Sequence, residues 1–156
     1  MSGMDYNCNN MTLTEAIAAR HSVRAYRRQP LADEAAKALE ELIAEINREG
    51  EKIACYIAVG YGASQGAGHK TKTVEQVSNA GPDTPAWFRR GVEAALLAPT
   101  AVNQQKFRFE YSGVKAGRHQ VLAKRGFSMI GYTRMDLGIA KCHFEIGAGE
   151  EPFDWV

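Results

Sequence analysis

The sequence predicts an α+β fold in which helices flank a mixed β-sheet. Two observations support this class: apolar residues recur at helical spacing in Leu31–Glu49 and again before Pro99, and apolar and polar side chains alternate in Lys106–Tyr111, as in a strand with one buried face. The 156 residues suffice for one domain with its own core. We therefore expect a flexible tail over residues 1–11 and a single domain over residues 12–156.

The N-terminal half is predicted to contain two helices and one strand. The first helix begins at Thr12, because Glu15 completes a capping box three residues later, and it ends at Arg20. The helix Leu31–Glu49 is expected to bury an apolar stripe. The nearly apolar run Lys52–Gly60 is typical of a buried central strand. The residues expected to be buried in the two helices are Leu13, Ala16, Ile17, Ala36, Leu39, Leu42, Ile43 and Ile46.

The middle of the chain is predicted to contain a helical turn, a helix and a hairpin. A capping box starting at Thr73 opens the turn. The helix that follows has Thr84 as its N-cap and ends at Pro99, because proline disfavours the helical conformation of the residue before it. A turn at Lys115–Gly117 leads into the return strand His119–Lys124.

The C-terminal segment is predicted to form one more helix, over about residues 134–147. Residues 127–132 are a candidate for another strand. On the helix, Lys141 and Glu145 are spaced for an exposed ion pair. The aromatic tail at residues 152–155 is expected to dock on the rest of the domain.

The composition excludes several classes of protein. A net charge of +1 gives no electrostatic reason to bind nucleic acid or an anionic membrane surface, and no apolar run is long enough to span a bilayer. The first ten residues are polar and do not resemble a signal peptide. Three widely spaced cysteines indicate a reducing compartment, so we expect a cytoplasmic protein. No CxxC or HxxxH pattern occurs, and we expect no metal site.

The segment RHSVR, directly after the first helix, is the first candidate binding motif. In an extended segment, Arg20, Ser22 and Arg24 point to one side and His21 to the other. Arg20 and Ser22 could then hold one anion, through a guanidinium fork and a hydroxyl donor. The alternative is a solvated basic turn that interacts with the helix dipole.

The loop PTAVNQQ, from Pro99 to Gln105, is the second candidate. Its consecutive carboxamides offer paired donors and acceptors, which suit the edge of a flat heteroaromatic ring. The alternative is structural: Asn103 and Gln105 hold the end of the helix and the start of the strand.

A glycine-rich stretch after the predicted strand is the third candidate. It fails the phosphate-loop patterns, because Gln65 and His69 stand where glycines are required. It nevertheless places Lys70 and Lys72 on the same side of an extended segment, where they could hold a phosphate. The alternative is a pair of solvated lysines.

Together, RHSVR at residues 20–24 and APTAVNQQ at residues 98–105 resemble the two flavin motifs of the FMN-dependent nitroreductase family. The resemblance extends over most of residues 12–155 and is closest to the subgroup with two half-repeats in one chain. The segment DLGIA at residues 136–140 is also similar to the family's helix near the dimer core.

The resemblance implies a role for each matching residue. Arg20 and Ser22, with His21 in the same motif, hold the FMN phosphate or ribityl chain, and the pair Lys70 and Lys72 grips the phosphate.

The resemblance also implies that Arg24 lies near the polar edge of the isoalloxazine. Pro99, Thr100 and Ala101 line the ring, and Asn103 and Gln105 bond to its edge.

The activity that the resemblance implies is the transfer of a hydride from NAD(P)H through FMN to nitroaromatic or quinone-like acceptors. Positive donors near the flavin stabilise its reduced form, so no catalytic side chain is required beyond those that bind the cofactor. A homodimer is expected to complete the sheet.

The sequence departs from the subgroup in one place. A block that normally lies between the second helix and the central strand is missing, and residues 50–53 lead almost directly into that strand. The chain is therefore either a compact variant that completes its site from a second copy or an internally deleted chain. The alternative functions are a non-catalytic flavin-binding module and a cofactor-free interaction domain.

Overall fold

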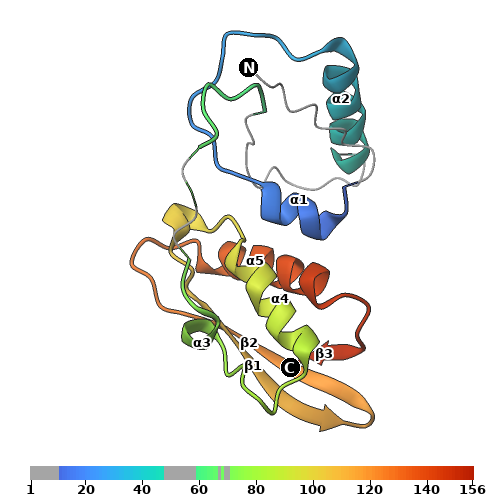
Figure 1. Ribbon diagram of the computed structural model, residues 1–156, viewed down its shortest axis with the longest axis vertical. Helices are drawn as coiled ribbons and strands as arrows, with labels where there is room; N and C mark the ends of the chain where they lie inside the picture. The colour runs from blue at the N-terminus through green and yellow to red at the C-terminus, as the bar shows by residue number, and fades with distance from the viewer. Residues whose placement is uncertain (1–10, 48–58, 67, 69–70) are drawn as a thin grey trace. The chain divides into compact units, whose positions relative to one another are not determined.

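The computed structural model describes residues 11–47, 59–66, 68 and 71–156 (Figure 1). The chain divides into two compact units. The first comprises Met1–Arg20 and His69–Val156, and the second comprises His21–Gly68. Almost all of the predicted tail lies outside the described residues.

The first unit is built on a three-stranded sheet with the order β1-β2-β3. Strands β1 (Phe107–Lys115) and β2 (Arg118–Arg125) form the predicted hairpin, and β3 (Phe153–Trp155) lies parallel to β2. The hairpin turn places Ala116 and Gly117 at positive φ, as a tight two-residue turn requires. The sheet is mixed, which confirms the predicted α+β class.

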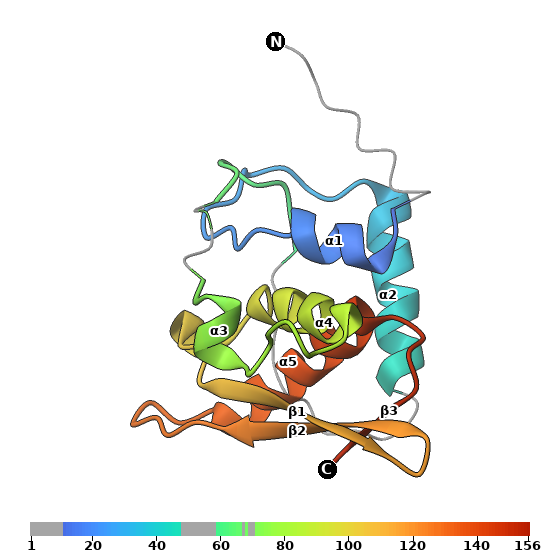
Figure 2. The same cartoon turned by 60° about the horizontal axis from the view of Figure 1, so that its bottom comes forward.

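Two long helices lie side by side over one face of this sheet (Figures 1 and 2). They are α4 (Ala86–Leu96) and α5 (Thr133–Ala148), and the short α3 (Val74–Val77) precedes them. Gly91 and Gly147 allow the close approach of α4 and α5, because a Cβ at either position would overlap the facing helix.

The core between helices and sheet is rich in aromatic rings. Phe109 of β1 and Phe144 of α5 are fully buried, and their ring centroids lie 4.9 Å apart. Trp87 of α4 stacks on Phe153 of β3 at 5.4 Å. The C-terminal aromatics therefore dock as predicted, since β3 both completes the sheet and covers the core.

Helix α1 (Leu13–Ala19) also belongs to the first unit and begins as predicted. Thr12 and Glu15 form the capping box, and Arg20 is the C-cap. Ile17 is buried, but Leu13 and Ala16 are exposed, so only one of the three residues predicted to be buried is confirmed.

The second unit contains α2 (Asp33–Asn47). Tyr26 and Gly62 form an isolated antiparallel bridge within this unit. The predicted apolar stripe of α2 is only partly covered: Leu42 and Ile43 are each more than half exposed, which contradicts the expectation that they are buried. Most of the predicted strand Lys52–Gly60 lies outside the described residues.

Two local predictions need correction. Thr84 does not cap α4, because Pro85 is the N-cap and the Thr84 hydroxyl instead exchanges hydrogen bonds with the backbone of Gly81. Residues 127–132 form no strand. The third strand comes from the C-terminal tail, whose backbone can pair with the free edge of β2.

The predicted ion pair between Lys141 and Glu145 is also wrong. The indole N–H of Trp155 donates to Glu145 at 2.6 Å, and the Lys141 ammonium lies 4.4 Å from the centroid of the same ring. The docked tail thus separates the two charges. In the described part of the chain, no helix has the length and apolar character that crossing a membrane requires.

Candidate functional site

The predicted binding loop lies between α4 and β1 and contains the 3-10 turn η2 (Ala101–Asn103). Pro99 cannot continue α4, and the chain turns back through hydrogen bonds from Asn103 N–H to Thr100 O and from Gln104 N–H to Ala101 O.

The backbone of this loop is strained. Val102, Asn103 and Gln105 all have positive φ values, of 45°, 56° and 46°. For a β-branched residue such as Val102 this conformation is unfavourable. Clusters of such residues occur at functional sites, where the surrounding structure holds them in place.

Gln105 is the structural centre of the loop. Its side-chain Nε2 donates to Leu96 O at 2.8 Å, and its Oε1 accepts from Lys72 N–H at 2.8 Å. The residue is only 2% exposed. These contacts agree with the structural interpretation of Gln105. The residue lies just before β1, and its side chain holds the end of α4. Contact with a flavin would require the side chain to leave both partners.

Two polar residues that were not predicted as site residues fasten the loop to α5. Asp136, which is only 2% exposed, accepts hydrogen bonds from Ala101 N–H at 2.9 Å and from the side chain of Gln104. Gln104 also donates to Gly131 O at 3.1 Å.

A sequence signal for Asp136 exists. It lies four and eight residues before Ala140 and Phe144, so it belongs to the buried stripe of α5. A carboxylate in such a stripe indicates a buried hydrogen-bond acceptor.

Two of the predicted cations bond on either side of the loop, one at the end of α4 and the other at Gln105. The Arg20 guanidinium donates to Leu97 O at 3.2 Å, and the Lys72 ammonium donates to Gln105 O at 2.6 Å. Burial lowers the pKa of Lys72, and the charge of Lys106 adds to this effect. A bound anion would oppose the lowering, because an opposite charge favours the protonated amine.

The remaining predicted site residues fall into three groups: those in the loop, those in the second unit, and one outside the described residues. In the loop, Thr100 is buried and its hydroxyl accepts from Gln105 N–H at 3.2 Å, whereas Pro99 and Asn103 are exposed and Ala101 is half-buried. His21, Ser22 and Arg24 belong to the second unit and are exposed. Lys70 lies outside the described residues.

The first unit therefore brings together Arg20, Lys72 and the loop. Such a site offers two cationic groups, an exposed carboxamide at Asn103 and an apolar surface at Val102, which is 73% exposed. These groups suit a planar ligand that carries an anion. Among the described residues, His, Cys, Asp and Glu side chains form no group of three that could hold a metal ion.

Comparison with known proteins identifies the family. A model of the family described as "Putative TM nitroreductase" matches residues 47–148, more than half of the chain. The fold is similar to a crystal structure of a "putative nitroreductase" from Thermotoga maritima MSB8, with a TM-score of 0.60 over 94% of this chain and 88% of that one. The two sequences are 16% identical, so this likeness concerns the fold. No curated protein matches. By the match to its family model, the chain belongs to the "Putative TM nitroreductase" family.

Proposed function

We propose that the protein is an FMN-dependent oxidoreductase that accepts a hydride from NAD(P)H and reduces nitroaromatic or quinone-like acceptors. One observation carries this proposal: Arg20 and Lys72, which are 52 residues apart in the sequence, bond on either side of the same strained segment, Arg20 to Leu97 O at the end of α4 and Lys72 to Gln105 O. Membership of a nitroreductase family supports oxidoreduction as the reaction class.

The donor set of this site fits FMN. A phosphate dianion requires cationic donors, which Arg20 and Lys72 supply. No acidic residue occurs from Leu97 to Phe109, so the loop itself does not repel an anion. The nearby Asp136 is buried, and its two oxygens accept from Ala101 and Gln104.

FMN, when bound, would supply the redox chemistry by accepting a hydride and passing it on. The protein would then bind and orient the rings. Asn103 presents a carboxamide that can both donate to and accept from a ring edge, while Val102 and Pro99 supply apolar surface. A positive donor near the ring, the role that the resemblance gives to Arg24, would favour the reduced flavin.

Several residues enter the proposal through the family resemblance alone. His21, Ser22, Arg24 and Lys70 are proposed to contribute to phosphate or ring binding. We also propose a homodimer, which the family resemblance implies, and a cytoplasmic location, which the three widely spaced cysteines indicate.

An absorption spectrum of the purified protein, recorded after FMN is added and the sample is desalted, tests cofactor binding. Retained yellow colour that bleaches on anaerobic addition of NADH or NADPH is the expected result. Flavin that stays yellow with both nucleotides would instead favour a non-catalytic binding module. Loss of all flavin on desalting would contradict the proposal.

Arg20→Ala tests the phosphate contact. It should weaken FMN binding by about 1.5–3 kcal/mol, the range for loss of a hydrogen bond to a charged group. Arg90→Ala is the matched control, because Arg90 is an exposed arginine on α4. Equal FMN affinities of Arg20→Ala and the unaltered protein, in folded samples, would refute the role of Arg20.

A further inference from the structure

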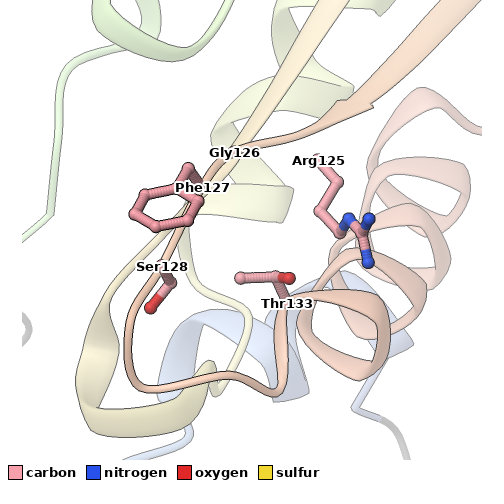
Figure 3. Close-up of a pocket in the computed structure, with 5 residues that line it drawn as sticks. All are labelled: Arg125, Gly126, Phe127, Ser128 and Thr133. Carbon is pink, nitrogen blue, oxygen red and sulfur yellow. The ribbon is translucent and has the colours of Figure 1, made fainter.

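A separate cavity lies in the first unit, where β2 ends and α5 begins. It has a volume of about 360 Å³ and is lined by Arg125, Gly126, Phe127, Ser128 and Thr133 (Figure 3). The Thr133 hydroxyl points toward the side on which the Arg125 guanidinium lies, and the Phe127 ring lies on the other side (Figure 3). One wall is therefore cationic and polar, and the other is aromatic.

The segment of the chain that carries the cavity's lining residues is rich in positive charge. Residues 124–135 contain three cations, Lys124, Arg125 and Arg134, and no acidic residue. Lys124 is bound to Glu110 at 2.6 Å. Arg125 takes part in none of the ion pairs formed within the described residues. Its guanidinium is therefore available to an anionic ligand.

The nearest acidic residue along the chain is Asp136. Its carboxylate is buried and accepts hydrogen bonds from Ala101 and Gln104, so it is already engaged by the loop between α4 and β1. Its negative charge still opposes an anion in this region, and the Arg125 guanidinium offsets this repulsion.

The segment that lines the cavity also exposes apolar side chains, one of them at Phe127 in the cavity wall and another two residues further along the chain. Phe127 is 85% exposed and Met129 is 93% exposed. Neighbouring exposed apolar side chains of this size commonly mark a binding surface.

The turn that carries these side chains is held in place. Gly126 N–H donates to Lys106 O at 2.7 Å, and the Ser128 hydroxyl accepts from Ile130 N–H at 3.1 Å. A Cβ at Gly126 would lie 3.1 Å from Lys106 O, so glycine permits this closure. The apolar side chains thus project from an ordered turn.

We propose that this cavity binds a small aromatic carboxylate. The planar guanidinium of Arg125 matches a carboxylate with two parallel hydrogen bonds, and Thr133 can donate a third. The Phe127 ring can stack on an aromatic ring attached to the carboxylate. An inorganic anion would leave the aromatic wall unused, and a neutral aromatic would leave Arg125 without a partner. The proposal does not rest on flavin binding.

Benzoate is the probe for this site, and its binding can be followed by amide chemical shifts of the full chain. We expect saturable shifts at Gly126, Ser128 and Thr133 at millimolar benzoate. Acetate, which lacks the ring, and benzamide, which lacks the charge, should each bind about tenfold more weakly. Benzoate shifts that are absent, or matched by acetate or inorganic phosphate at equal concentration, would overturn the aromatic carboxylate assignment.

Two variants locate the binding. Arg125→Gln should weaken benzoate binding about tenfold, and Phe127→Ala should weaken benzoate binding while leaving acetate binding unchanged. Arg90→Gln, the loss of an exposed arginine elsewhere in the same unit, should have no effect. Equal losses in Arg125→Gln and Arg90→Gln would show non-specific electrostatic attraction and refute the site. If Arg125→Gln does not fold, the contrast between benzoate and acetate in Phe127→Ala decides the question.

Discussion

The carboxylate of Asp136 accepts a hydrogen bond of 2.9 Å from the main-chain N–H of Ala101, 35 residues earlier in the chain. The bond joins the first turn of α5 to the start of the strained loop that follows α4. The second carboxylate oxygen accepts from Gln104, three residues further along the loop. Asp136 therefore holds both sides of η2 and offsets part of the cost of its positive φ values.

Asp136→Asn should destabilise the protein by about 1.5–3 kcal/mol, because an amide nitrogen would face a donor that the carboxylate now satisfies. Urea denaturation measures this change. Asp154→Asn is the control: Asp154 is partly exposed in an ion pair with Arg118, so its replacement should cost much less. Equal losses in the two variants would contradict the anchoring role of Asp136.

The two carboxamides of the loop should respond differently to substitution. Gln105→Ala leaves Leu96 O and Lys72 N–H without their partner and should cost about 2–4 kcal/mol of unfolding free energy. Asn103→Gly removes an exposed carboxamide where positive φ suits glycine, and should therefore cost less than Gln105→Ala.

Thermal or urea unfolding separates the roles of the two carboxamides, and FMN titration completes the test. We expect Asn103→Gly to fold normally and to bind FMN more weakly. A large stability loss in Asn103→Gly would instead assign it the structural role that Gln105 has.

The contact between α4 and α5 predicts opposite effects of alanine at two glycines of α5. Gly147→Ala would place a methyl group against the Cβ of Ala94 and 2.8 Å from Arg90 O, and should destabilise by about 1–3 kcal/mol. Gly138→Ala meets no atom within 4 Å and should stabilise the helix by about 0.5–1 kcal/mol. Melting temperatures of the two variants that move in the same direction would contradict this packing.

The stability of the first unit should depend on pH through His143. Burial lowers the pKa of His143, the charge of Arg20 lowers it further, and a hydrogen bond to Ala94 O partly opposes this. The unfolded chain then binds a proton more readily than the folded chain. Stability should therefore fall as the pH drops below the ordinary histidine pKa of about 6.5, and should be constant with respect to this group above it.

His143→Gln removes this titration and supplies the comparison. The difference between the unfolding free energies of the variant and the unaltered protein should vary with pH below the ordinary histidine pKa of about 6.5, and should be flat well above it. A difference independent of pH would show that His143 does not titrate differently in the two states.

Local patterns in the sequence predicted the elements whose stabilising contacts are close in the chain. The capping boxes at Thr12 and Thr73, and the alternation that forms β1, are confirmed because each depends on residues a few positions apart. The loop after the helix was also predicted from local information, because Pro99 disfavours the helical conformation of the residue before it.

The Lys141–Glu145 pair and the side chain of Gln105 show where this local information ends. The spacing of Lys141 and Glu145 predicts an ion pair on an isolated helix, but Trp155 arrives from the C-terminal tail and interacts with both. Gln105 resembles a ligand-facing carboxamide in the sequence, but its partners are Leu96 and Lys72.

The sequence by itself thus determined the α+β class, the capping boxes at Thr12 and Thr73, the hairpin and the place of the loop after Pro99. Only the tertiary structure decided that Arg20 bonds to the end of α4 before that loop, that Lys72 bonds to Gln105 within it, and that Asp136 fastens it to α5. The physical reason is distance along the chain. Caps, turns and strand alternation follow from short-range hydrogen bonding and periodicity, whereas the partner of a buried polar group is fixed only when distant segments pack together.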